Sequence, residues 1–344
     1  MADGTGNQAQ KPAGEAFPQY IHSTFRDSLS RNKIVISIFF VFIILWLVYL
    51  TGNFKVFSSF QIYKAFLSTI PFIGIMALAE TFIVTLGDMD LSFPSTMALS
   101  AWIFCTLVSV GVNVWIAALA CLLTGALCGL FNSILIVRIG MPSLVITIAT
   151  QYLYRGAVNV LASGHGISIS RLNDTVFANL AVYRLFGHIP MQAVWFLIFT
   201  IFFWLLMNRH WYGTHIAFIG DNKASARMMG INVNAVRSTA FVVMGLAASF
   251  TGILSNIEVQ FFWPSQGDSL MMPVLAAIFI GGTSVMGGKG SIMGTFMGAF
   301  IIGSLEAGIV AIGLTGFWVQ FIYGSVIIVA VTLYTLISGS RVKN

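Results

Sequence analysis

The stretch Gly87-Asp88-Met89-Asp90-Leu91-Ser92-Phe93-Pro94 interrupts an apolar segment that extends from Thr69 to Val112. An apolar segment of this length is typical of two membrane-spanning helices. Glycine and proline disfavour helix interiors, and backbone groups freed inside a membrane must face protein or water. The stretch therefore predicts a membrane protein whose second helix is broken beside two carboxylates. A plain loop between two helices is the alternative interpretation.

The composition supports a membrane protein. The chain has 344 residues, of which 58% are hydrophobic and 8% are charged. A soluble domain carries about 25% charged residues, so this chain cannot cover a water-facing surface. Its apolar residues suffice for roughly ten spans of about 20 residues each. These values exclude a soluble enzyme, a nucleic-acid-binding protein and a secreted disulfide scaffold.

Continuous apolar runs predict an all-α polytopic membrane protein with about ten transmembrane helices. A transmembrane barrel would instead show short alternating segments. The expected helices span residues 34–51, 67–86, 94–110, 115–137, 142–161, 191–208, 238–258, 270–286, 291–313 and 317–337.

The basic residues predict the orientation of these helices. With the N-terminus inside, most of the 17 Lys and Arg residues fall in inward-facing segments, as the positive-inside rule requires. Both termini are therefore expected in the cytoplasm. We expect a disordered cytoplasmic tail at 1–33, a transmembrane domain at 34–337 and a cytoplasmic tail at 338–344. Within the domain, segment 162–190 is expected outside and segment 209–237 inside.

A second interrupted span lies in the C-terminal half. The run Leu270-Met271-Met272-Pro273 opens it, and a glycine-rich turn from Gly281 to Gly290 closes it. Paired interrupted helices in the two halves of a membrane protein indicate a transport pathway.

Two pairs of small residues predict close helix packing. Gly125 and Gly129 form one pair, and Gly294 and Gly298 form the other. Glycines four residues apart let two helix backbones approach each other. We expect a packing role for both pairs and not a substrate site.

Four acidic residues lie in or near the apolar stretches: Glu80, Asp88, Asp90 and Glu306. A charge in lipid costs a few kcal/mol or more, so each is expected to face the protein interior or a cavity. A proton relay is one interpretation, although every histidine lies in a tail or a loop. A hydrogen bond from protonated Glu80 and a polar path for a solute are others, and the roles of Glu80 and Glu306 stay open.

The inward-facing segment 209–237 contains signals for a short helix. Asp221 or Asn222 can cap its start, and Gly230 can end it in a left-handed conformation. Lys223 and Arg227 form a basic row beside apolar positions. Such a helix is suited to dock into a groove on a soluble partner. The alternative is a surface helix that lies on anionic lipid headgroups.

The sequence carries no motif for nucleotide hydrolysis or other catalysis. A phosphate-binding loop around Lys289 would need a glycine six residues earlier and Ser or Thr directly after it. Thr283 and Gly290 occupy these positions. No zinc spacing or catalytic Cys–His pair is present, and the three cysteines are expected to be buried apolar residues. We expect no enzymatic activity and no metal site, so any ATPase must be another chain.

Four segments together resemble the permease subunits of bacterial ABC importers of the ribose, xylose and arabinose type. The interrupted stretch 87–92 is similar to the family's Gly-Gly-Ile-Asp-Leu-Ser segment. The other matching pieces are Asn132-Ser133 with 141–147 and 155–156, the loop 220–233, and the glycine-rich connection 281–291. The resemblance covers about residues 34–337.

The resemblance implies an ABC importer permease core with several partners. These are a second permease subunit, identical or a close paralogue, two ATP-binding subunits and a periplasmic sugar-binding protein. ATP and Mg²⁺ would be bound by the partner ATPase and not by this chain. The protein would lie in the bacterial inner membrane and import a monosaccharide or related polyol by alternating access. An ion-coupled secondary transporter that acts without an ATPase is the alternative.

Two sets of functional residues follow. The substrate pathway is expected to include Glu80, Asp88, Asp90, Ser92, Asn132, Thr147 and Gln151. Coupling to the ATPase is expected to involve Gly220, Asn222, Lys223, Ala226, Arg227 and Gly230. Asp88 and Pro94 stand where the family more often has glycine, so the identity of the cargo stays open.

Overall fold

The computed structural model describes residues 38–173 and 175–339. The expected tail at 1–33 lies outside these residues, and so do residues 340–344 of the expected tail at 338–344. Residues 338 and 339 belong to the last helix.

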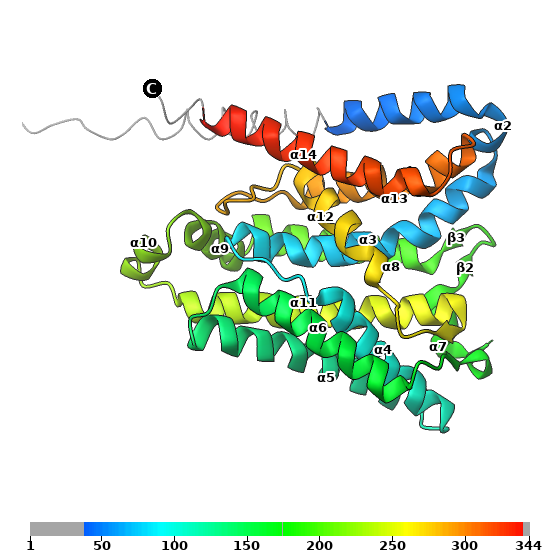
Figure 1. The fold of residues 1–344 in the computed structure, drawn as a ribbon, viewed down its shortest axis with the longest axis horizontal. Helices are drawn as coiled ribbons and strands as arrows, with labels where there is room; N and C mark the ends of the chain where they lie inside the picture. Colours follow the sequence, from blue (N-terminus) through cyan, green and yellow to red (C-terminus); the bar gives the residue numbers. More distant parts are fainter. Residues whose placement is uncertain (1–37, 174, 340–344) are drawn as a thin grey trace, which may run out of the picture.

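The described residues fold into long helices that lie side by side (Figure 1). In chain order the main elements are the helix Ile38–Gly52, α2 (Phe54–Phe57), α3 (Phe60–Thr85), α4 (Phe93–Ser109), α5 (Val114–Ser133), the π-helix η1 (Ile134–Arg138), α6 (Ser143–Ala162), α7 (Val176–Val182), α8 (Met191–Asn208), α9 (Trp211–Asp221), α10 (Lys223–Met228), α11 (Val233–Val259), α12 (Met271–Ile280), α13 (Ile292–Ala311) and α14 (Phe317–Gly339). Two short antiparallel pairs, β1 (Ile167–Ser168) with β4 (Phe261–Phe262) and β2 (Arg184–Leu185) with β3 (Ile189–Pro190), connect some of the loops.

All ten expected helices are present, and three of their bounds differ by five residues or more; the expected start of the first helix, at 34, lies outside the described residues. Helix α3 begins seven residues early, at Phe60. Helix α11 begins at Val233 because the Asn232 side chain accepts a hydrogen bond from the Ala235 N–H and caps it. The prediction 270–286 was too long, since α12 ends at Ile280, where Gly281 and Gly282 follow and Gly282 takes a φ of +81°.

Five of the described helices are long and apolar enough to cross a membrane, judged by length and composition: α3, α5 with η1, α8, α11 and α13. The helices Ile38–Gly52, α4 and Asp268–Ile280 are apolar but shorter. The two shorter helices α4 and α12 each adjoin one of the interruptions read from the sequence.

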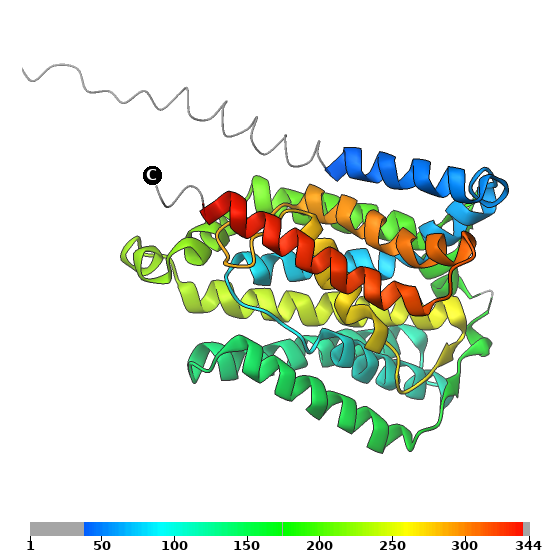
Figure 2. The same cartoon turned by 45° about the horizontal axis from the view of Figure 1, so that its top comes forward.

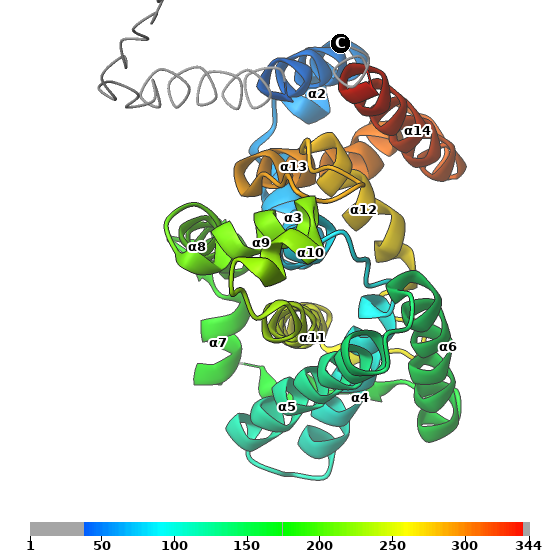
Figure 3. The same ribbon diagram turned by 90° about the vertical axis from the view of Figure 1, so that its left-hand side faces the viewer.

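The two ends of the bundle carry different elements (Figure 1), and Figure 3 views the bundle from the end that carries α9 and α10. One, which we call the α10 end, carries α9 and α10, and α9 packs against α3 there. The other, which we call the hairpin end, carries α7 and the β2–β3 hairpin. In Figure 2, α14 runs along α13 and α12, with which it is in contact.

Both glycine pairs lie at helix crossings, which confirms the packing prediction. A Cβ atom added at Gly125 would overlap Ser249 Oγ and the Gly245 carbonyl oxygen of α11. A Cβ atom at Gly298 would overlap the Ala277 carbonyl oxygen of α12. At such crossings a backbone-to-backbone approach replaces side-chain packing.

Candidate functional site

The interruption at Gly87–Ser92 follows α3, which is itself continuous despite Pro71. After α3 the chain folds back along the helix: the Asp90 N–H donates a hydrogen bond of 2.9 Å to Oε1 of Glu80. Glu80 has no exposed surface. We call residues 86–92, between α3 and α4, the link. At a rise of 1.5 Å per residue, the link returns about 7 Å along the axis of α3 before α4 begins. The break therefore places polar backbone beside a buried carboxyl group.

Asp90 organises a buried polar network around the start of α4. Its Oδ1 accepts hydrogen bonds from the Ser92 N–H at 2.8 Å and the Ser92 hydroxyl at 2.6 Å. Asn132 of α5 donates to Ser92 Oγ at 2.7 Å, and the Tyr154 hydroxyl of α6 donates to Asn132 Oδ1 at 3.1 Å. The network joins the link to α3, α5 and α6, so four of the seven expected pathway residues lie together.

The other three expected pathway residues lie outside this network. The Thr147 hydroxyl donates to the Ser143 carbonyl, one turn earlier on α6, at 2.9 Å, and it also lies 3.3 Å from the Met89 carbonyl of the interrupted stretch. Gln151 is half-buried on α6, and its Oε1 has no hydrogen-bond partner among the described residues. Asp88 is in an ion pair with Arg237 and Lys223, near the α10 end.

The sequence did not predict a role for Tyr154, because a tyrosine in an apolar helix is typical of an ordinary core residue. We expect Tyr154→Phe to lower the free energy of unfolding by about 1 kcal/mol, because the amide oxygen of Asn132 loses a donor. The measurement is the thermal unfolding midpoint of the purified protein. Tyr152→Phe is the matched control, since Tyr152 is 75% exposed on the same helix. Equal midpoints for the two variants would contradict the role of the Tyr154 hydroxyl.

Helix α10 has the predicted caps. The Asn222 side chain accepts hydrogen bonds from the Ala224 and Ser225 N–H groups at 2.9 and 3.0 Å, so Asn222, and not Asp221, is the capping residue. Gly230 ends the helix with a φ of +80°, a left-handed conformation that favours glycine. The short helix is therefore fixed by its own sequence at both ends.

One face of α10 is turned toward its own protein and the other is open. Ala226 is buried, whereas Arg227 is exposed and Met228 is 84% exposed. The apolar positions at helical spacing in the sequence are Ala224, Met228 and Ile231, and the structure buries Ile231 at 8% exposure but leaves Ala224 and Met228 uncovered. Exposed methionines adapt to the shape of a partner surface.

Helix α10 follows directly from a tight backbone contact that we call the glycine junction, made by Thr85, Gly87, Gly220, Gly287 and Gly288. The Gly288 N–H donates to the Thr85 carbonyl at 2.8 Å. A Cβ atom at Gly220 would overlap both of these backbone atoms. The end of α9, the end of α3 and the glycine-rich loop therefore meet without intervening side chains, three residues before α10 begins.

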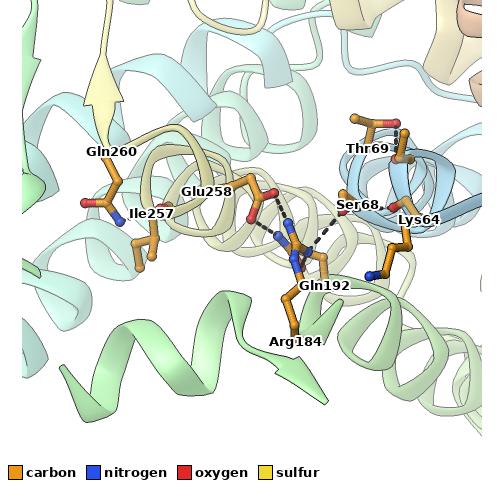
Figure 4. Close-up of polar contacts among 9 residues, drawn as sticks. Lys64, Ser68, Thr69, Arg184, Gln192, Ile257, Glu258 and Gln260 are labelled. Carbon is orange, nitrogen blue, oxygen red and sulfur yellow. Dashed lines mark hydrogen bonds and ion pairs between the residues drawn. The ribbon is translucent and has the colours of Figure 1, made fainter. Parts of the chain in front are cut away.

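The hairpin end has its own ionic network, which the sequence did not reveal. Arg184 of β2 donates to Glu258 Oε1 of α11 at 2.5 Å and to the Ser68 hydroxyl of α3 at 3.0 Å (Figure 4). Gln192 of α8 donates to Glu258 Oε2 at 2.6 Å. The network ties the hairpin to three helices, and its members are too far apart in the chain for any spacing pattern to show.

A second group at this end surrounds Arg155 of α6. Its guanidinium is 2.6 Å from Asp268 Oδ1 and donates to the Gln266 carbonyl at 3.0 Å. Gln266 is buried and donates to Ser255 of α11 at 3.1 Å. These contacts fix the loop that precedes α12, the second of the two shorter helices.

Comparison with known proteins agrees with this architecture. The sequence-family model described as branched-chain amino acid transport system, permease component, matches residues 62–331. The chain belongs to this family of transport permeases. It is 35% identical over 268 residues to the autoinducer 2 import system permease protein LsrD of Klebsiella pneumoniae, which covers 75% of this chain and 79% of that protein. LsrD of Enterobacter sp. strain 638 is 34% identical over the same length, with 75% and 80% covered. No solved structure matches the chain.

The permease is thus a subunit of an ABC importer, a multi-pass protein of the inner membrane and not an enzyme. The comparisons support the expected resemblance to sugar importer permeases and decide against the ion-coupled secondary transporter. An importer of this kind works with ATPase and binding-protein partners. The interrupted stretch 87–94 and the short helix α10 both lie within the matched region.

Proposed function

We propose that this permease pairs with a second permease subunit, identical or a close paralogue, and with two ATP-binding subunits and one periplasmic binding protein. The observation that carries this proposal is α10, a capped helix with an uncovered face that follows the glycine junction. A helix held out of the bundle with exposed Met228 and Arg227 is suited to a groove on a soluble partner. ATP and Mg²⁺ are then held by that partner, and hydrolysis moves α10.

The α10 end faces the cytoplasm in this proposal, and the hairpin end faces the periplasm. Most basic residues of the interhelical segments support this orientation, including Arg138, Arg209, Lys223 and Arg227 at the α10 end. Both termini then lie in the cytoplasm.

Single cysteines test this orientation. Cys105, Cys121 and Cys128 are buried, so they do not react with a membrane-impermeant maleimide. In intact spheroplasts, Ser170→Cys at the hairpin end is expected to be labelled, and Ser225→Cys on α10 only after the membrane is opened. Both serines are exposed. The reverse pattern would overturn the orientation.

The proposed cargo is a monosaccharide or related polyol. The network of Asp90, Ser92 and Asn132 offers hydroxyl and amide groups, and Gln151 Oε1 is a buried acceptor without a partner among the described residues. Arg155, the basic residue of α6, forms an ion pair with Asp268 and donates hydrogen bonds to backbone carbonyls. Such surroundings suit a neutral, hydroxyl-rich solute that moves beside them by alternating access.

The test is reconstitution of the importer in liposomes, with the subunits that co-purify from native membranes. With ATP inside and the binding protein outside, uptake of labelled pentoses, hexoses and polyols is measured against autoinducer 2 and leucine. We expect ATP-dependent uptake of a hydroxylated solute and no uptake by this chain alone. Uptake by the chain alone would overturn the function, and uptake of leucine in preference to every polyol would overturn the cargo.

A further inference from the structure

Asp88 has a different environment from the acids around it. Its carboxylate is 5% exposed, and Arg237 binds it through two bonds, Nε to Oδ2 at 2.7 Å and Nη2 to Oδ1 at 2.9 Å. Lys223 Nζ lies 3.5 Å from Oδ1. The side chain of Arg237 is 11% exposed and that of Lys223 is 41% exposed. One partner of Asp88 is therefore enclosed and the other is open to water.

The three residues belong to three functional elements. Asp88 lies in the link after α3, two residues before Asp90 and its buried network. Lys223 is the first residue of α10, and Arg237 lies near the start of α11. Asp88 is thus the residue through which the link contacts both α10 and α11.

The two ion pairs differ in strength. An arginine that binds a carboxylate through two parallel bonds fixes its direction as well as its distance. A lysine in a half-exposed pair at 3.5 Å contributes little, because water screens the charges. A displacement of α10 can therefore break the Lys223 contact while the Arg237 contact keeps the link attached to α11.

We propose that Asp88 is a positioning residue that transmits the movement of α10 and the start of α11 to the link and so to the Asp90 network. This inference rests on the proposed function, in which an ATPase moves α10. In the proposed mechanism, force reaches the link through Arg237 at the start of α11, and the Arg237–Asp88 pair converts it into a shift of the link beside Glu80. The sequence placed Asp88 in the substrate pathway, and the inference gives it a mechanical role instead.

The test measures cargo imported per ATP hydrolysed by the reconstituted importer. Asp88→Asn keeps the shape of the side chain and removes its charge. We expect the ratio to fall about tenfold or more, because without the carboxylate the two Arg237 bonds no longer fix the direction of the link and movement of α11 is not passed to it. Asp88→Glu keeps the charge and is expected to recover part of the ratio. Lys223→Gln is expected to lower it about twofold at most, since exposed pairs are weak.

Arg138→Gln is the matched control for Arg237→Gln. Arg138 is exposed at the end of η1, which packs against α11, and it forms no ion pair among the described residues. We expect the Arg138→Gln importer to keep the wild-type ratio, whereas Arg237→Gln behaves like Asp88→Asn. A purely structural role of the pair would lower the yield of all charge-removing variants without a change in the ratio of the protein that assembles.

If a single variant does not assemble, the double variant Asp88→Asn with Arg237→Gln removes both charges at once and leaves neither uncompensated. We expect it to assemble and to show the ratio of the better single variant, because the two residues act as one unit. A wild-type ratio in Asp88→Asn or in the double variant would overturn the inference and leave the proposed function intact. Failure of the wild-type importer to use ATP would overturn the proposed function first.

Discussion

Gly125→Val is expected to abolish the folded permease. A Cβ atom at this position overlaps Ser249 Oγ and the Gly245 carbonyl oxygen, and Gly245 meets Gly125 in the same way from the other helix. The Ser249 hydroxyl can rotate away, but the Gly245 carbonyl is backbone and no rotamer change removes that overlap, so α5 must move away from α11. Overpacking costs about 1–3 kcal/mol where side chains can adjust, and more where backbone must move.

The yield of monodisperse protein in size-exclusion chromatography measures this effect. Gly156→Val is the matched control, because a Cβ atom at Gly156 of α6 meets nothing within 4 Å. We expect Gly156→Val to purify like the wild type and Gly125→Val to be recovered as aggregate. A monodisperse Gly125→Val protein with an unchanged unfolding midpoint would show that the α5–α11 crossing is not required.

Gly220→Ala is expected to uncouple ATP hydrolysis from uptake. The added Cβ overlaps the Thr85 carbonyl oxygen and the Gly288 N–H, the two groups whose hydrogen bond closes the glycine junction. Separation of these segments leaves α10 with its own caps, but the end of α9 that carries it is no longer fixed against α3. We expect uptake to fall about tenfold or more, which corresponds to about 1.4 kcal/mol or more of lost coupling, while basal ATP hydrolysis continues.

The measurement for Gly220→Ala is uptake and ATP hydrolysis in the same liposomes. Gly156→Ala carries the same substitution in a helix where the added carbon has free space, and it is expected to keep the wild-type rates of both. A Gly220→Ala importer with wild-type uptake would show that α10 receives its position from elsewhere.

Structural features that depend on residues within a few positions of one another could be predicted from the sequence. Asn222 and Gly230 enclose α10 as predicted because capping and a left-handed end depend on neighbours within one turn. The ten apolar runs and the glycine pairs were also readable, since length and spacing alone decide them. The predicted end of α12 at residue 286 was wrong because the helix already stops at Gly281 and Gly282, where Gly282 takes a left-handed φ of +81°.

Contacts between segments far apart in the chain could not be predicted from the sequence. Asp88 and Arg237 are 149 positions apart, and in the sequence Arg237 counted only as one more inward-facing charge. Asp88 was grouped with Asp90 because the two are close in the chain, yet their partners lie on different elements. The network of Arg184, Gln192 and Glu258 was missed for the same reason, since a polar residue near a helix end gives no information about its partner.

The glycine junction also sets an order for biosynthesis. Thr85, Gly220 and Gly288 come from three separate parts of the chain, and the ribosome adds about 5–20 residues per second. Helix α10 therefore leaves the ribosome several seconds before the glycine-rich loop that completes its support. During this interval α10 has its caps and its packing against α9 but lacks the Gly288–Thr85 hydrogen bond, so its support is complete only after synthesis of the C-terminal half.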